Sequence, residues 1–155
     1  MHKIIALLTI SLLFASCNHT VSNEFEECIK EKNKIEANKK MVVEFYQELL
    51  GNKNLDVINQ YIKEDYIQHN PMAADGREAL KEVFSRWFKD AKPEKIDFRH
   101  IIAEDDLVVL HIKGKLGNKP VAIMDIFRIE DGKIAEHWDI IQEIPEKSAN
   151  DHPMF

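Results

Sequence analysis

The spacing of hydrophobic residues changes once along the chain, near residue 95. Before that point apolar residues recur every three to four positions, which predicts amphipathic helices. We expect a first helix to end near Leu50, where Gly51 follows. A second, short helix is capped by Asn54. A third opens with a capping box from Asp75 to Glu78, and its apolar stripe comprises Ala79, Leu80, Val83, Phe84, Trp87 and Phe88.

After residue 95 polar and apolar residues alternate, which is the pattern of half-buried strands. The connections between the alternating segments are short, so we expect an antiparallel meander. Helices first and strands afterwards indicate an α+β fold, with the helices packed on one face of a curved antiparallel sheet. The expected strands cover residues 96–103, 107–116, 121–129 and 134–142.

The first 16 residues have the pattern of a signal peptide: Lys3 precedes an apolar run at 4–14, which is too short to cross a bilayer as a helix. The run ends at Ala15-Ser16-Cys17 and resembles a bacterial lipobox, in which the Cys is acylated. We therefore expect Cys17 to carry a lipid anchor. The alternative is ordinary cleavage near Ser16, which would leave Cys17 as a thiol.

A lipid on Cys17 would place the protein in a bacterial cell envelope, exported, anchored to a membrane and facing the periplasm. Residues 17–33 would then be a polar tether. The only other cysteine, Cys28, would have no intramolecular partner, so we expect no structural disulfide.

Composition fits one globular domain, which we place at residues 34–145, followed by a tail at 146–155. The 155 residues are 45% hydrophobic and 31% charged, with only 5 Gly and 5 Pro. The net charge of −6 argues against nucleic acid as a partner, because phosphate binding requires clustered Lys and Arg.

The last predicted hairpin has two plausible registers, and they place Asp125 differently. A two-residue turn at Asp131-Gly132 pairs Glu130 with Lys133 and sets Asp125 opposite Trp138. A three-residue loop with a bulge pairs Ile129 with Lys133 and sets Asp125 opposite His137. We favour the second register. It gathers Asp125, Phe127, His137 and Asp139 on one face and leaves Trp138, Ile134 and Ile126 on the other.

His137 and Asp139 lie on the same side of one strand, about 7 Å apart along it. If helices cover that face, a carboxylate there loses its hydration and becomes a usable general acid or base near neutral pH. The alternative is a solvated strand face with ordinary polar residues. Pairing through Gly117-Asn118 puts Leu110 beside Asp125 and sends His111 to the outer face. His69 lies in an extended stretch that ends at Pro71, and we expect it to point into the same cavity. The alternative is a surface or hydrogen-bonded structural histidine.

Several motifs that carry other chemistry are missing from the sequence. It has no HExxH and no paired Cys ligands, no Gly-rich phosphate loop and no GxSxG elbow. A metal site built from His69, His137, Asp125 and Asp139 is conceivable. We nevertheless expect no metal and no other cofactor.

Four segments together resemble the SnoaL-like polyketide cyclase family: 66–71 (YIQHNP), 76–78 (GRE), 124–128 (MDIFR) and 131–139 (DGKIAEHWD). The resemblance covers residues 38–143. It implies the cone-shaped fold of the nuclear transport factor superfamily, in which a curved sheet and helices enclose a pocket and the convex face often dimerises.

The resemblance also implies roles for individual residues. Asp139 takes the position of the family's acid/base residue. Asp125 takes the position of a polar helper that is His in the cyclase, so two carboxylates would share this cavity. The segment around His69 matches one that supplies polar pocket residues in related epoxide hydrolases.

We therefore expect a cofactor-independent acid/base enzyme acting on a small apolar carbonyl compound, of the cyclase, isomerase, dehydratase or hydrolase type. The alternatives are a lipoprotein that binds a small ligand without catalysis and a structural module. Asp139, Asp125 and His69 are the expected catalytic residues. The expected ligand contacts are His137, Trp87, Phe88, Phe127 and Leu110. A homodimer is expected through the outer sheet face, at Trp138, Ile126 and Met124.

Overall fold

The structure, a computed structural model, describes the backbone of residues 3–155 and the side chains of residues 23–155. The chain divides into two compact units, Met1–Lys34 and Ile35–Phe155. The helix α1 (Lys3–Tyr46) begins in the first unit and ends in the second. No helix among the described residues has an apolar stretch long enough to cross a membrane.

Three further helical segments follow α1 in the second unit. They are a π-helical turn, η1 (Gln47–Gly51), and the helices α2 (Val57–Tyr61) and α3 (Arg77–Trp87). The predicted helix end near Leu50 is confirmed. The predicted second helix ends one residue early, because Ile62 already belongs to a strand.

The capping box predicted at Asp75 is wrong. Gly76, with φ 93°, is the N-cap of α3, and it makes no side-chain cap hydrogen bond. The Asp75 carboxylate instead accepts the backbone N–H of Gln68 at 2.8 Å. Asp75 therefore satisfies an amide at the end of a strand rather than one at the start of a helix.

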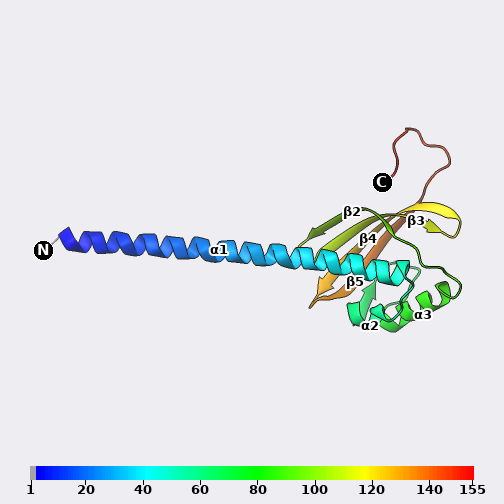
Figure 1. Cartoon of the computed structure of the whole chain (residues 1–155), viewed down its shortest axis with the longest axis horizontal. Helices are drawn as coiled ribbons and strands as arrows, with labels where there is room; N and C mark the ends of the chain where they lie inside the picture. Colours follow the sequence, from blue (N-terminus) through cyan, green and yellow to red (C-terminus); the bar gives the residue numbers. More distant parts are fainter. Residues whose placement is uncertain (1–2) are drawn as a thin grey trace. The chain divides into compact units, whose positions relative to one another are not determined.

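The sheet has five strands in the order β1-β5-β4-β3-β2; Figure 1 labels β2 to β5. The predicted antiparallel meander is confirmed as β2 (Asp97–Glu104), β3 (Leu107–Leu116), β4 (Lys119–Glu130) and β5 (Lys133–Glu143). The sequence pattern missed β1 (Ile62–Gln68), which pairs parallel with β5 and makes the sheet mixed. Ile58 and Ile62 continue a helical spacing, so the pattern concealed the start of this strand. The α+β class is confirmed.

The β4–β5 hairpin has neither predicted register along its whole length. Asp131 (φ 51°) and Gly132 (φ 73°) form a two-residue turn with both residues left-handed, and Glu130 pairs with Lys133. A left-handed conformation at both positions is typical of type I′ hairpins, whose twist matches that of the strands. The three-residue loop that we favoured is therefore wrong at the turn.

A bulge at Ala135 then changes the register by one residue. Ile129 pairs with Ile134, but Arg128 pairs with Glu136, so Ala135 is the extra residue. Because of this shift the predicted face forms, but with other partners: Asp125 pairs with Asp139 and Phe127 with His137. The predicted pairing of Asp125 with His137 is therefore wrong. Ile134 lies before the bulge and therefore faces inward. Its predicted place on the outer face is wrong, since it is fully buried.

The hydrophobic core lies between one face of the sheet and the helices. α2 and α3 lie next to β1 (Figure 1). Asp125 is buried together with this core, at 4% exposure. The apolar core residues from the helices include Val42, Phe45, Tyr46, Leu49, Ile58, Leu80 and Phe84, and those from the strands include Val108, Leu110, Phe127, Ile129 and Ile134.

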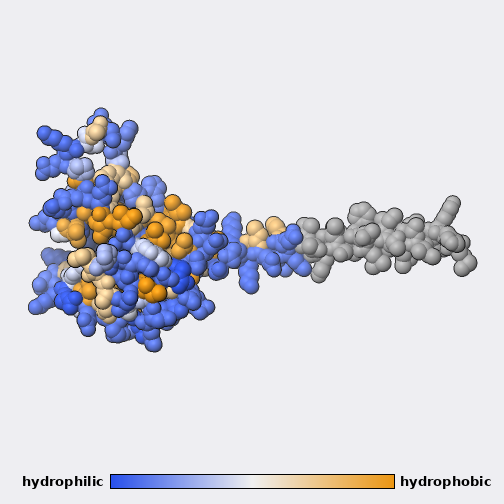
Figure 2. Space-filling view, turned by 180° about the vertical axis from the view of Figure 1, so that it is seen from behind, coloured by the Kyte–Doolittle hydropathy of each residue, from blue (hydrophilic) through white to orange (hydrophobic). Residues whose placement is uncertain are grey.

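The opposite face of the sheet, called the outer face below, carries exposed apolar side chains. Ile102 is 61% exposed and Ile140 is 67% exposed. His111 pairs with Met124 on this face, as predicted. Figure 2 shows hydrophobic patches among hydrophilic surface on the side of the molecule that it presents.

Candidate acid–base site

Three polar side chains meet on the helix-covered face of β4 and β5. Asp125 lies directly opposite Asp139, and His137 is the next inward-facing residue of β5. His137 Nε2 is 3.2 Å from Asp125 Oδ1, and one donor atom from each of the three residues lies within 4.8 Å of the others. The structure therefore brings together the group of residues predicted from the sequence, which we call the Asp125 cluster.

Asp125 is the most buried member of the cluster, with a side chain that is 6% exposed. Leu110 lies beside it on β3. Burial raises the pKa of Tyr46 well above its usual range, and the negative charge of Asp125 and a side-chain hydrogen bond to it raise the pKa further, so Tyr46 stays a neutral hydroxyl next to Asp125. Among the described residues, Asp125 Oδ2 has no hydrogen-bond partner.

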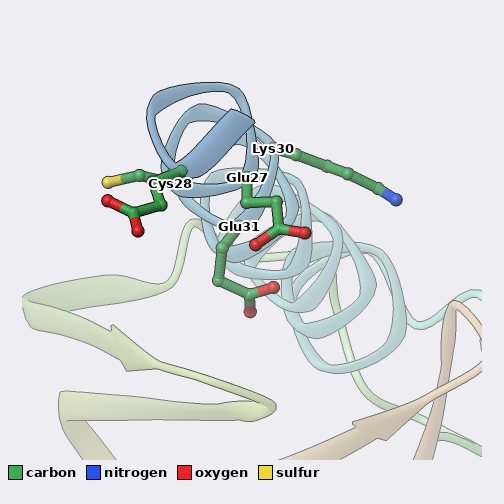
Figure 3. A pocket seen from close by; sticks show the side chains of 5 residues that line it. Glu27, Cys28, Lys30 and Glu31 are labelled. Atoms are coloured by element: carbon green, nitrogen blue, oxygen red, sulfur yellow. The ribbon is translucent and has the colours of Figure 1, made fainter. Parts of the chain in front are cut away.

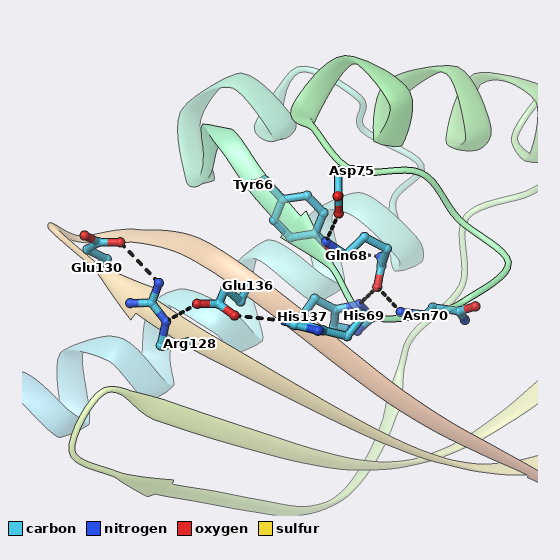
Figure 4. Close-up of polar contacts among 9 residues, drawn as sticks. All are labelled: Tyr66, Gln68, His69, Asn70, Asp75, Arg128, Glu130, Glu136 and His137. Carbon is cyan, nitrogen blue, oxygen red and sulfur yellow. Dashed lines mark hydrogen bonds and ion pairs between the residues drawn. The ribbon is translucent and has the colours of Figure 1, made fainter.

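The position of the proton on His137 follows from Gln68, at the end of β1. Gln68 Oε1 accepts the backbone N–H of Asn70 at 2.9 Å, and Gln68 Nε2 donates to the Tyr66 hydroxyl at 3.0 Å (Figure 4). These two bonds fix which end of the amide carries the oxygen. His137 Nδ1, at 3.1 Å from Gln68 Oε1, is therefore a protonated donor.

A hydrogen bond at the contact between His137 and Asp125 requires one proton between them. With Nδ1 protonated, Nε2 and Asp125 Oδ1 would both present lone pairs across 3.2 Å unless one of them carried a proton. The pair is either an imidazolium with a carboxylate or a neutral imidazole with a carboxylic acid. In both forms it holds a proton that can be transferred.

Asp139 is held by Asn70. Asn70 Nδ2 donates to both carboxylate oxygens of Asp139, at 2.9 and 2.7 Å. Asn70 Oδ1 accepts the backbone N–H of Met72 at 2.8 Å, which fixes the orientation of the amide. Our sequence reading missed both Asn70 and Gln68. The extended stretch before Pro71 is the feature of the sequence that indicates these two residues, and it also contains His69.

His69 does not face the Asp125 cluster. Its ring stacks on Trp138 with centroids 4.2 Å apart, and its Nε2 lies 2.8 Å from Glu136 Oε2. Glu136 and Trp138 alternate with His137 along β5 and point to the outer face. The predicted position of His69 in the cavity is therefore wrong, because Gln68 and Asn70, on either side of it, are the residues that reach inward.

The predicted apolar contacts lie in different surroundings. Phe127 is buried, and its ring centroid is 4.8 Å from that of His137. Phe88 is half-buried and stacks on Phe84 at 5.2 Å. Trp87 is 63% exposed and touches Phe84 only edge-on, so its predicted place in a pocket wall is wrong. It lies in the last turn of α3, on the solvent side of Phe84.

Two hollows on the described surface lie away from the cluster. One is an open depression along α1 around Cys28, a free thiol (Figure 3). Its side chains are all exposed: Glu24, Glu27, Cys28, Lys30 and Glu31. The other is an apolar groove between α1 and β2, lined by Val43, Ile96, Phe98 and Ile101 among others. Neither hollow is lined by a residue of the Asp125 cluster.

Solved structures share this arrangement of a curved mixed sheet and helices. TsrD from Streptomyces laurentii is 22% identical, with a TM-score of 0.56, covering 68% of this chain and 88% of TsrD. An NTF2-like protein of unknown function from Burkholderia xenovorans LB400 is 17% identical, with a TM-score of 0.60 and coverage of 74% and 91%. An LEH-like epoxide hydrolase of M. tuberculosis is 16% identical, with a TM-score of 0.56 and coverage of 70% and 85%. The fold is therefore NTF2-like.

The family is also shown by sequence. Residues 40–147, more than half of the chain, match the family described as SnoaL-like polyketide cyclase. The chain belongs to this family, as its motifs indicated. No curated protein matches the sequence.

Proposed function

We propose that this SnoaL-like protein is a cofactor-independent acid/base enzyme that acts on a small apolar carbonyl compound. The reaction would be of the cyclase, isomerase, dehydratase or hydrolase type. The observation that carries the proposal is the 3.2 Å contact between His137 Nε2 and Asp125 Oδ1, next to the carboxylate of Asp139. A proton donor and a proton acceptor side by side, with one of the carboxylates buried, are what such a reaction requires.

In this proposal Asp139 is the principal base. Asn70 binds both of its oxygens through one amide nitrogen, which orients the carboxylate and leaves further lone pairs free. Asp139 would remove a proton from the carbon next to the substrate carbonyl. The His137–Asp125 pair would then supply its proton to the carbonyl oxygen, where negative charge develops.

Proton abstraction can be tested before the natural substrate is known. A panel of small ketones and aromatic carbonyl compounds is incubated with the protein in D2O, and exchange of the α-hydrogen is followed by NMR. Wild-type protein should accelerate exchange of at least one compound. Asp139→Asn should reduce that rate by about 10²-fold or more, because general acid/base catalysis contributes about 10²–10⁴.

Glu136→Gln is the matched control, since it removes a carboxylate from the outer face of the same strand. It should leave exchange unchanged. Equal exchange by wild type and Asp139→Asn would refute the role of Asp139. Tight binding of a compound without exchange would instead support the alternative, a cell-envelope protein that binds a small ligand.

We also propose that Cys17 is acylated and anchors the exported protein to a membrane of a bacterial cell envelope, facing the periplasm. The proposal rests on the apolar run that ends at Ala15-Ser16-Cys17. Metabolic labelling with a fatty-acid analogue should mark wild type and fail with Cys17→Ser. Cys28→Ser should keep the label, and a label that survives Cys17→Ser would disprove the anchor.

A homodimer through the outer face is the third part of the proposal. Trp138, Ile126 and Met124 line the outer face of β4 and β5, and the neighbouring Ile140 is 67% exposed. An apolar surface of this kind is costly in water and is often covered by a second copy. Light scattering at high micromolar concentration should give twice the chain mass for wild type and a monomer for Ile140→Glu. A monomeric wild type would exclude the dimer.

A further inference from the structure

The unpartnered oxygen of Asp125 is the feature of the cluster that proton transfer does not explain. The side chain is 94% buried, and Oδ2 has no hydrogen-bond partner among the described residues. A buried oxygen without a partner loses its hydration and gains nothing in return, at a cost of about 1–3 kcal/mol. The Tyr46 hydroxyl lies next to Asp125 but does not satisfy Oδ2. A buried carboxylate oxygen beside a second carboxylate and an imidazole is suited to binding a cation.

We propose that Asp125, His137 and Asp139 bind a divalent transition-metal ion such as Zn²⁺, which takes the place of the proton between His137 and Asp125. Our expectation from the sequence was that no metal binds. The donor set is one imidazole nitrogen and two carboxylates, ligands that Zn²⁺ accepts at about 2.0–2.2 Å. Three protein ligands leave a fourth position open.

The spacing of the donor atoms suits this ion. Ligands at about 2.0–2.2 Å in a tetrahedron lie roughly 3.4 Å from one another. His137 Nε2 and Asp125 Oδ1 are already 3.2 Å apart, and all three residues offer atoms within 4.8 Å. Small side-chain movements therefore complete the site.

Residues outside the cluster already orient two of the three ligands. Gln68 Oε1 accepts the Nδ1 proton of His137, so the nitrogen that faces the carboxylates is Nε2. Asn70 donates to Asp139. Hydrogen bonds of this kind hold the ligands of metal sites in position, and their loss typically weakens binding 10–100-fold.

The negative charges of the cluster also favour binding of a cation. Besides burial, the negative charges of Asp125 and Asp139 raise the pKa of Tyr46 and of Tyr66. The cluster is therefore a region of negative potential with no Lys or Arg hydrogen-bonded to it in the described structure. A divalent cation would neutralise two carboxylates and a neutral imidazole without leaving net charge.

Ion and proton exclude each other at His137, and this has two consequences. Binding of the ion should release about one proton and should weaken as the pH falls. The ion would also block the shared proton, so it would regulate the proposed acid/base chemistry rather than support it. Binding itself is measured on the resting protein and does not depend on turnover.

The test is calorimetric titration of the metal-free full chain with Zn²⁺. We expect one high-affinity site per chain, with about one proton released, as measured by repeating the titration in buffers of different ionisation enthalpy. His137→Gln should weaken binding at least 10²-fold, and Gln68→Leu should weaken it 10–100-fold. Circular dichroism of each variant verifies that it is folded.

His111→Gln is the matched control. His100 and His111 stack on the outer face with their Nδ1 atoms 3.0 Å apart, and they are the competing imidazole pair. This variant should bind Zn²⁺ like wild type. Absence of a high-affinity site, or a site lost with His111→Gln and kept with His137→Gln, would overturn the proposal.

Co²⁺ gives a readout that requires no variant. Its visible spectrum should show nitrogen and oxygen ligands without a thiolate charge-transfer band, which would appear if Cys28 or Cys17 were the ligand. A thiolate band would overturn the proposal. Hydrogen exchange by metal-free protein tests the proposed enzyme separately, so either idea can fail while the other stands.

Discussion

Two contacts between a histidine and a carboxylate lie on opposite faces of the β4–β5 hairpin. On the helix-covered face, His137 and Asp125 are 3.2 Å apart, with side chains that are 13% and 6% exposed. On the outer face, His69 and Glu136 are 2.8 Å apart, with side chains that are 36% and 18% exposed. The outer contact is shorter, but it is the more solvated one.

The surroundings of the two contacts differ more than their lengths. Glu136 also pairs with Arg128 at 2.7 Å, and Arg128 continues to Glu130, so positive charge and water both stabilise the outer carboxylates (Figure 4). Asp125 has a buried oxygen without a partner. The comparison teaches that burial, rather than distance, decides where removing a charge is costly.

The largest effect on the free energy of unfolding should come from removing the contact between His137 and Asp125. Asp125→Ala leaves His137 Nε2 buried without a partner and should lower the free energy of unfolding by about 3–5 kcal/mol. Glu136→Gln on the outer face should lower it by less than about 1 kcal/mol. Urea denaturation measures both. Similar losses for the two variants would contradict the comparison.

Gln68 and His69, which are neighbours in the chain but lie on opposite faces, provide the next test of the comparison. Gln68→Leu removes the acceptor of His137 Nδ1 and of the Asn70 amide, and it should cost about 1–3 kcal/mol. His69→Leu, one residue further on, should cost less than about 1 kcal/mol, because its ring lies on the outer face. A larger loss for His69→Leu would mean that the faces are assigned wrongly.

Alkaline titration tests whether the tyrosines of the inner face are buried. Burial raises the pKa of all three tyrosines, and the charges of Asp125 and Asp139 add to this at Tyr46 and Tyr66. A raised pKa means that the folded state favours the protonated form. The stability it contributes is complete below the unfolded pKa of about 10 and is lost as the pH rises above it. Tyrosinate absorbance at 295 nm from Tyr46 and Tyr66 should therefore appear only together with unfolding. Its appearance at pH 10 in folded protein would contradict their burial.

The smallest expected effect is on the free energy of unfolding at acidic pH. The hydrogen bond from His69, followed by that from Arg128, lowers the pKa of Glu136. A lowered pKa contributes stability above the unfolded value of about 4.3, and this stability is lost as the pH falls through the folded value. Between pH 6 and 3 wild type should lose up to about 1 kcal/mol more than Glu136→Gln. Parallel pH profiles would show that the outer contact contributes nothing.

The class of the fold and most of the inner face follow from local patterns in the sequence. Helical spacing before residue 95 and alternation after it fixed the order of elements. Alternation within 125–127 and within 137–139 also fixed which residues share a face in each strand, because period two is a local property of extended backbone. The family motifs were equally local, and the match over residues 40–147 agrees with them.

The pairing of the strands, in contrast, depends on contacts between segments that are distant in the sequence. The bulge at Ala135 sets Asp125 opposite Asp139, and it arises from hydrogen bonds between two strands rather than from the spacing within either. The pairing of β1 with β5 likewise decides that Gln68 and Asn70 face inward and His69 outward. From the sequence we selected His69 because imidazole is a common catalytic group. The pairing of β1 with β5 instead places the amide side chains of Gln68 and Asn70 on the inner face.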